Sequence, residues 1–320
     1  MAREFTFTKG KREQVPLLVG IMGASGSGKT FSAQRLAKGM QRVYGGKIFG
    51  LDTEGRRMLH YADMFDFEWC EFAPPFGPLD YLAAIRAAVE QGARIIVCDS
   101  TSHMHEGEGG ILERHEEELA KLGGRAKDSF RAWTKPKAEL QRFINGINQI
   151  NASFIFCFRA KEKSKPATDE KTGKSELKEL GMMPICSPEL IYEMTACALL
   201  MPNANGVPTW NPQNVGERMM VKQPEQFREL FKQHAGQPLS EDMGEAMARW
   251  AQGGEQRQAA TKPAEGPFRF PRGDYAGKTL AEAPEGYLSG LLDNDKTPDT
   301  LKELIEAELE RRMSEEAQGT

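Results

Sequence analysis

The residues best suited to chemistry form the stretch GASGSGKT near the amino terminus. It comprises Gly23, Ala24, Ser25, Gly26, Ser27, Gly28, Lys29 and Thr30, and it fits GxxxxGK[ST] at every fixed position. The glycines let backbone N–H groups turn inward around an anion, and a following helix adds its dipole. In such a loop the lysine reaches the β- and γ-phosphates and the final hydroxyl ligates Mg²⁺. The stretch predicts a site for ATP and Mg²⁺, and a plain glycine- and serine-rich turn is the alternative.

Two acidic residues could complete this chemistry. Asp99 ends the apolar run RIIVCD, the expected place for the carboxylate that holds the Mg²⁺ water shell. A helix or turn cap is the other interpretation of Asp99. Glu54 follows the run KIFGLD and could polarise water toward the γ-phosphate if its strand lies beside the phosphate loop. Otherwise Glu54 is an exposed loop acid.

These residues need a sheet to position them, and the sequence predicts one between about residues 17 and 201. Strand-like apolar runs occupy residues 16–23, 47–54, 94–100 and 153–158. Helical patterns separate them at residues 29–44, 79–92, 111–124 and 135–150. Residues 190–201 and 218–223 are also strand-like. Strands that alternate with helices predict an α/β fold whose mainly parallel sheet is covered on both faces.

The character of the chain changes near residue 236. Residues 253–266 are polar, contain Gly, Pro and Ala and lack periodicity, as linkers do. A short stretch with a charged helical pattern follows. We therefore expect a nucleotide-binding domain over residues 1–235, a helix and flexible linker over 236–266, a small, mostly helical accessory module over 267–313 and a tail over 314–320.

Composition excludes several classes of protein. The chain has 320 residues, of which 39% are hydrophobic and 28% are charged, as in soluble globular proteins with room for more than one domain. The net charge of -4 means that an anionic partner must be bound by a local patch. The five scattered cysteines lack CxxC spacing, which favours a reducing cytoplasm without a disulfide frame or zinc site. We expect no signal peptide and no membrane association.

The order of these motifs resembles the RecA-like P-loop ATPase core. It is most similar to the compact, core-only RecA-type ATPases of phages and prophages, described as single-strand annealing or recombination proteins. The resemblance covers about residues 17–231 and is carried by GASGSGKT, LDTEGR, APPFGPLDYLAAIRAA, IIVCDSTSHMHEGEGG, FIFCFRAKEK and LIYEMTACALLM. It implies ATP hydrolysis in the cytoplasm of a phage-infected bacterium. It also implies that Glu54 is the hydrolytic glutamate and that Asp99-Ser100 is the strand aspartate with its serine.

The resemblance implies two loops that face single-stranded DNA. The first is residues 101–110, with His103 and His105, and the second is residues 160–188, whose lysines include Lys161, Lys163 and Lys165. Acidic residues dilute the second stretch, so a solvated surface loop is its alternative interpretation. The two histidines lack a further Cys or His partner nearby in the sequence, which argues against a metal site there.

The chain also departs from RecA. Arg159 stands near the place of the glutamine that senses the γ-phosphate in RecA. Lys222, with Arg218 as a weaker match, is the nearest counterpart of the lysines that act across the subunit interface. We see no large amino-terminal polymerisation domain. These features imply a homo-oligomer in an annealing or helper role rather than true strand exchange.

Residues 268–293 resemble a small module appended to some phage and bacterial nucleases, with Asp274 replacing a lysine of its pattern. Protein docking is at least as good an interpretation of this module as DNA binding. For the whole chain, the expected function is a DNA-stimulated ATPase that assists annealing or recombination. One alternative is a nucleotide-switched interaction protein, such as a loader or anti-defence factor. The other is a P-loop kinase, whose lid would have to be the stretch GGRAKDSFRAW with Arg125 and Arg131.

Overall fold

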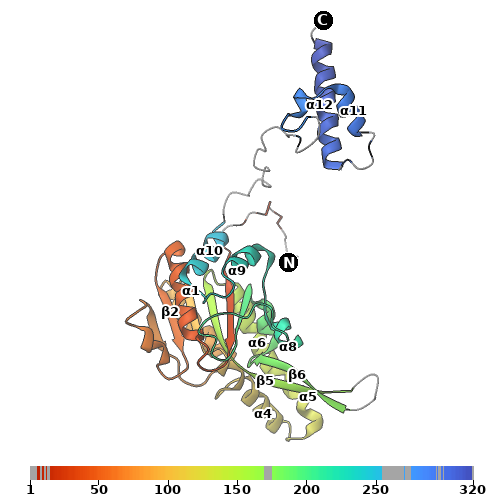
Figure 1. The fold of residues 1–320 in the computed structure, drawn as a ribbon. Helices are drawn as coiled ribbons and strands as arrows, with labels where there is room; N and C mark the ends of the chain where they lie inside the picture. Colours follow the sequence, from red (N-terminus) through yellow and green to blue (C-terminus); the bar gives the residue numbers. More distant parts are fainter. Residues whose placement is uncertain are drawn as a thin grey trace. The chain divides into compact units, whose positions relative to one another are not determined.

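A computed structural model describes residues 6–7, 9–10, 12, 15–168, 175–253, 270, 275–292, 294, 297 and 299–318. The chain divides into two compact units, Met1–Gly254 and Glu255–Thr320, and each is described here by itself (Figure 1). Nearly all of the expected linker lies outside the described residues, and so does Asp274.

The first unit is built on a seven-stranded sheet with the order β3-β2-β4-β5-β1-β7, and β6 pairs with β5 outside this path. The strands are β1 (Leu18–Gly23), β2 (Ile48–Asp52), β3 (Glu68–Glu71), β4 (Ile95–Asp99), β5 (Ser153–Thr168), β6 (Ser175–Pro184) and β7 (Ala196–Leu200). All pairs are parallel except β5 with β6. Every residue of β1, β2, β4 and β7 is buried, because helices cover both faces of the sheet.

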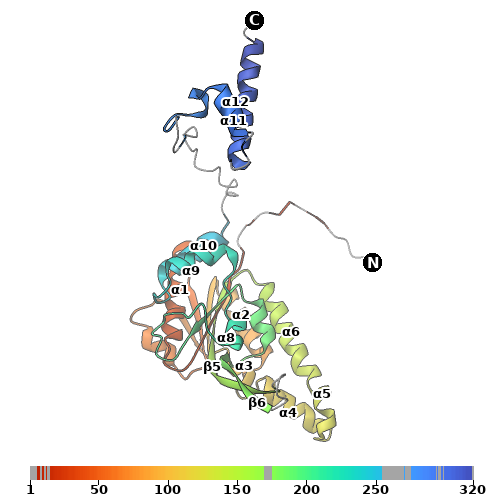
Figure 2. The ribbon, with the colours of Figure 1, turned by 45° about the vertical axis from the view of Figure 1, so that its right-hand side comes forward.

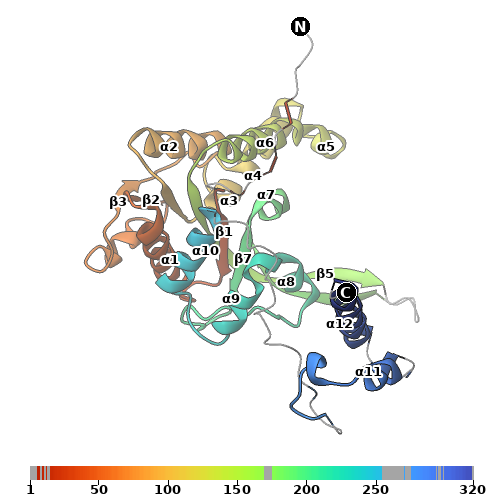
Figure 3. The same cartoon turned by 90° about the horizontal axis from the view of Figure 1, so that it is seen from above.

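Two layers of helices enclose the sheet (Figure 3). One face carries α1 (Lys29–Tyr44), α9 (Arg228–Gln233) and α10 (Glu241–Ala251), which share an apolar core with the sheet through Leu36, Phe231 and Met247. The other carries α2 (Pro78–Glu90), α3 (His103–Glu106), α4 (Ile111–Lys121), α6 (Thr134–Asn148) and α7 (Pro188–Glu193), which meet the sheet through residues such as Tyr81 and Phe143. The predicted fold class is confirmed, and this is the architecture that the resemblance to RecA-like ATPases implies.

Helices α1 and α10 cross at very short range. A Cβ atom on Gly39 would overlap the backbone oxygen of Glu241, and one on Gly244 would overlap the backbone oxygen of Leu36. Arg35 holds the same crossing through two hydrogen bonds from Nε and Nη2 to the Glu241 carboxylate, at 3.0 and 2.7 Å. Two glycines and one bidentate ion pair therefore fasten α10 to the helix that follows the phosphate loop.

Two expectations about local structure are wrong. Residues 218–223 are not a strand, because helix α8 (Val215–Met220) occupies the first half of them and only Lys222 forms a bridge, to Cys197. Residues 190–201 begin within α7, which starts at Pro188, and become strand β7 only at Ala196. Short apolar runs do not distinguish a strand from a buried helical turn, whereas proline favours the first helical position.

The stretches predicted as DNA-facing loops are also more ordered than expected. Most of residues 160–188 form the antiparallel β5–β6 hairpin, with a register shift between Lys163 and Ser164 (Figure 2). Residues 101–110 contain helix α3 and packed turns, in which Gly109 lies against Pro75. Backbone pairing and tight packing replace the open loops that polar, glycine-rich sequence suggested.

The second unit contains η4 (Leu280–Glu282), α11 (Glu285–Leu292) and α12 (Asp299–Gln318), so the predicted small, mostly helical module is confirmed for the described residues. Its core includes Leu288 and Ile305, both fully buried. Arg312 of α12 donates hydrogen bonds to the backbone oxygens of residues 280, 281 and 283, which ties α12 to the end of η4. None of the helices in the described ranges has the length and apolar character to cross a bilayer.

Candidate nucleotide site

A pocket of about 1300 Å³, open to solvent, lies where the carboxyl ends of the strands meet the phosphate loop. Such crevices are where open α/β sheets bind ligands. Its lining brings together residues from four separate parts of the chain: Ser25, Gly26, Gly28, Lys29, Thr30, Glu54, Arg57, His60, Tyr61, Asp99, Arg159 and Ala160. Sequence analysis singled out most of these residues.

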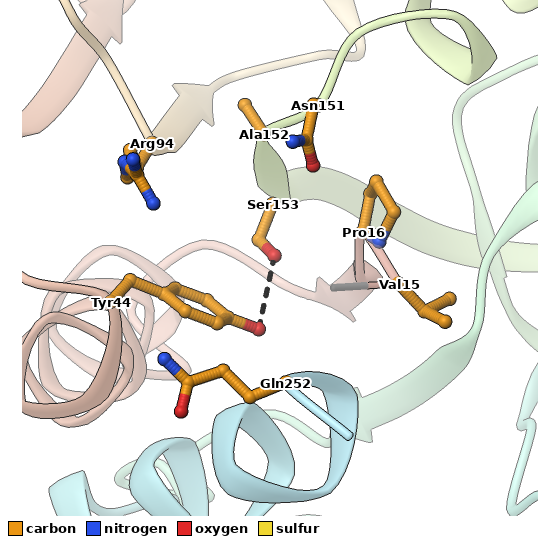
Figure 4. A pocket seen from close by; sticks show the side chains of 8 residues that line it. All are labelled: Val15, Pro16, Tyr44, Arg94, Asn151, Ala152, Ser153 and Gln252. Atoms are coloured by element: carbon orange, nitrogen blue, oxygen red, sulfur yellow. Dashed lines mark hydrogen bonds between the residues drawn. The ribbon is translucent and has the colours of Figure 1, made fainter. Parts of the chain in front are cut away.

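A second pocket, of about 390 Å³, lies at the opposite, amino ends of the strands (Figure 4). Ser153 donates a 3.5 Å hydrogen bond to the hydroxyl of Tyr44 there, and Arg94 and Gln252 complete its polar lining. Its lining contains no Asp or Glu among the described residues, and it lies away from the phosphate loop, so we place the candidate site in the larger pocket.

The phosphate loop has the backbone that its glycines predict. Gly26 and Gly28 have φ angles of +74° and +96°, a region that favours glycine. Gly206 braces the loop from behind, because its N–H donates to the Ser27 carbonyl at 2.9 Å. Lys29 donates from Nζ to the carbonyl oxygen of Ala24 at 2.7 Å, so the loop itself holds this ammonium group above its own backbone.

The groups expected to hold magnesium touch each other. The Thr30 hydroxyl donates a 2.5 Å hydrogen bond to Oδ2 of Asp99, which is buried at the end of β4. Burial raises the pKa of Asp99 to about 6, although the Thr30 hydrogen bond opposes this shift. A hydroxyl beside a carboxylate offers the oxygen donors that Mg²⁺ takes in nucleotide sites, where phosphates and water supply the other ligands. These two residues therefore fit the ion that the motif implies.

Glu54 reaches the pocket by a different route from the one expected. Strand β2 is not beside β1, because β4 and β5 lie between them. Glu54 nevertheless lines the pocket, since it lies in the turn beyond β2. The buried Asp52 carboxylate holds that turn by accepting hydrogen bonds from the N–H groups of Glu54 and Met58 and from Nε1 of Trp69. Sequence analysis missed this role, although a charged residue that ends an apolar strand was a usable signal.

The Glu54 carboxylate lies between two arginines. Arg159 donates from Nε to Oε1 at 2.7 Å, and Arg57 donates from Nη1 to Oε2 at 3.2 Å. Burial alone would raise the pKa of Glu54, whose side chain is only 11% exposed. The hydrogen bond and charge of Arg159, with the charges of His103 and Arg57, outweigh burial and leave the pKa below its usual value. Glu54 is therefore ionised, as a residue that accepts a proton from water must be.

Ser100 and His103 belong to the support of this pocket. The Thr53 hydroxyl accepts from the Ser100 N–H at 2.8 Å and lies 2.7 Å from Nδ1 of His103. The His103 ring stacks on Phe76, with centroids 5.1 Å apart. Ser100 is fully buried, and burial together with the Arg159 charge lowers the pKa of His103. His103 thus lies beside Glu54 and not on an open loop.

The other predicted site residues lie outside the pocket. Lys161, Lys163 and Lys165 are exposed on β5, where the strand leaves the sheet and enters the hairpin. His105 lies near the root of this hairpin, with Nδ1 3.4 Å from the Ser187 hydroxyl. Lys222 donates from Nζ to the backbone oxygens of Tyr192 and Met194, so its ammonium group has partners within its own chain.

Three residues of the pocket were not anticipated: Arg57, His60 and Tyr61 of the short helix η1 (Arg57–Tyr61). The Tyr61 ring is 5.6 Å from that of Phe31, which follows the phosphate loop on α1. An aromatic ring beside a phosphate site is suited to contact with a nucleotide base. The available signal was proximity, since all three residues closely follow Glu54 in sequence.

No protein-family model matches the chain. No curated protein matches it either. One similar solved structure is the KaiC-like protein PH0186 from the hyperthermophilic archaeon Pyrococcus horikoshii OT3, at 16% identity over 54% of this chain and 81% of that chain. The TM-score of 0.28 is too low for this likeness to support an assignment.

Proposed function

We propose that this protein is a RecA-like ATPase that binds single-stranded DNA and assists annealing or recombination. The observation that carries the ATPase part is the convergence of the phosphate loop, the Thr30–Asp99 pair and the ionised Glu54 on one pocket. Each of these groups has a defined task in phosphoryl transfer to water, and the pocket opens to solvent.

Each residue has a task in this proposal. Lys29 exchanges the Ala24 carbonyl for the β- and γ-phosphates. Thr30 and Asp99 hold Mg²⁺, directly and through its water shell, and the bound ion neutralises phosphate charge. Glu54 accepts a hydrogen bond from the attacking water and takes its proton.

Arg159 is proposed to connect the nucleotide to the hairpin. It contacts Glu54 in the pocket, and the next residue of the same strand, Ala160, is the first to pair with β6. A γ-phosphate that competes with Glu54 for the guanidinium would therefore act on the strand that carries the exposed lysines. The lysine-rich hairpin is our candidate DNA contact, made mainly through phosphates because phosphate contacts need only local positive charge.

Two further parts of the proposal concern partners. The chain is proposed to form a homo-oligomer, with Lys222 contacting the nucleotide of a neighbouring subunit after leaving its own backbone partners. The second unit is proposed to dock a protein partner. Of the alternatives, the kinase is the weaker, because neither Arg125 nor Arg131 lines the pocket that would need a lid.

The deciding experiment measures ATP turnover by the full chain with and without single-stranded DNA. We expect turnover that DNA increases. A variant with Lys161, Lys163 and Lys165 changed to alanine should bind DNA more weakly and lower the log–log salt slope by about 0.7 for each lost phosphate contact. Lys232→Ala, an exposed lysine on α9, is the matched control. Nucleotide binding without any response to DNA would favour the nucleotide-switched interaction protein instead.

A further inference from the structure

The first unit carries a helical arm made of α4, η2 (Ala126–Asp128), α5 (Ser129–Ala132) and α6. In Figures 1 and 2 this arm and the β5–β6 hairpin project from the same end of the unit. Phe130, in α5, is 87% exposed. Single exposed apolar residues are common on protein surfaces, so Phe130 gains meaning only from what surrounds it.

Positive charge surrounds Phe130. Residues 121–138 contain six Lys or Arg residues and only one acidic residue, although the whole chain has a net charge of -4. Arg125 is paired with Asp128, and both Lys121 and Lys135 are paired with Glu118. Lys127, Arg131 and Lys137 are exposed and have no ion pair among the described residues. Two of these cations, Lys127 and Arg131, are close to the exposed Phe130 ring in sequence, whereas the exposed carboxylates of the arm (Glu113, Glu116 and Glu117) lie on α4.

A groove lies between this arm and the residues that follow the hairpin. Trp133 and Lys137 of the arm line this pocket of about 600 Å³ together with His105, Ser187 and one carboxylate, Glu189. Burial lowers the pKa of His105, and the charges of the hairpin lysines Lys163 and Lys161 add to this shift, while the charges of Glu106 and Glu189 oppose it. Lys137 of the arm therefore lies at one side of the groove, and the hairpin lysines act on His105, which lines the same groove.

We infer that the arm is a second contact for single-stranded DNA, in which Phe130 stacks on an unpaired base and Lys127 and Arg131 contact the adjacent phosphates. This inference rests on the proposed function, because the strand would run from the hairpin lysines across the groove to the arm. An exposed ring beside cations fits single strands, whose bases offer free faces to aromatic side chains. Duplex DNA hides those faces, and an acidic peptide offers them only where it carries aromatic side chains.

The test compares Phe130→Ala with wild type by fluorescence anisotropy on labelled oligothymidine. We expect about tenfold weaker binding, the scale of one lost base–aromatic stack. Phe130→Trp should retain affinity and Phe130→Leu should not, since leucine keeps the apolar contact but lacks a ring face. Phe7→Ala is the matched control, because Phe7 is 93% exposed elsewhere in the chain. Circular dichroism verifies that each variant is folded.

A second probe separates stacking from charge. An abasic oligonucleotide of equal length offers the same phosphates and no bases, so wild type and Phe130→Ala should bind it equally. If Phe130→Ala binds oligothymidine as tightly as wild type while the hairpin lysine variant does not, the arm is not a contact and the proposed function stands. If wild type binds no single-stranded DNA, both the arm contact and the proposed function are overturned. If an acidic peptide is the only ligand that Phe130→Ala weakens, the arm docks a protein.

Discussion

Replacing Gly28 with alanine tests how the phosphate loop is braced. The alanine would have to adopt the φ of +96° that Gly28 has, which costs about 1–2 kcal/mol for a residue with a side chain. It would also lie 2.7 Å from the backbone N of Gly206, and such overpacking costs about 1–3 kcal/mol. Gly26→Ala is the matched control, because its φ is +74° but nothing lies within 4 Å of the new atom. Each variant lowers the conformational entropy of the unfolded chain by the same amount, so this effect on the free energy of unfolding cancels between them.

We therefore expect Gly28→Ala to be less stable than Gly26→Ala by about 1–3 kcal/mol in the absence of nucleotide. Urea unfolding followed by tryptophan fluorescence measures this difference. All four tryptophans lie before residue 254, so the signal reports the first unit alone. Equal stability of the two variants, at equal denaturant slopes, would show that Gly206 does not brace the loop.

Further predictions concern hydrolysis, assembly and pH. Lys29→Ala should abolish ATP hydrolysis in a steady-state assay. Turnover at the wild-type rate would contradict the assignment of Lys29 to the β- and γ-phosphates. Glu54→Gln should keep ATP affinity while slowing hydrolysis by about 10²-fold or more, and an affinity loss with unchanged turnover of bound ATP would make Glu54 a binding residue. ATP should strengthen self-association in sedimentation; a fully active monomer would contradict this. In the second unit, hydrogen bonding to Arg311 and Arg312 lowers the pKa of Glu308 from its ordinary value of 4.5 to about 2, so its stabilising effect is complete above pH 4.5 and is lost as pH falls toward about 2. Hydrogen exchange of α12 amides should show this loss of stability at low pH, and Glu308→Gln should remove the pH dependence.

Local sequence signals predicted the helix that follows GASGSGKT. The helix expected over residues 29–44 has the same bounds as α1, because the loop glycines precede it and Gly45 follows it. The parallel sheet was also predictable, since strands and helices alternate along the chain. The signals for both features are local in the sequence, although the sheet itself pairs strands that are distant along the chain.

Features that depend on distant contacts were not predictable. The strand order places β5 between β1 and β4, and no local pattern encodes that insertion. The hydrogen bond from Arg159 to Glu54 joins residues that are 105 positions apart, so its effect on the Glu54 pKa could not be anticipated. The hairpin was mistaken for a loop because its strands are polar and exposed and lack an apolar face.

The crossing of α1 and α10 decides where the first unit can be cut. A recombinant fragment that ends near residue 235, where composition begins to change, would leave out α10 and expose the α1 surface that Met243 and Met247 now cover. Such a fragment would display an unpaired apolar stripe and is expected to aggregate, whatever its affinity for nucleotide. A fragment that extends to Gly253 keeps α10, so α1, the helix that follows the phosphate loop, keeps its packing partner.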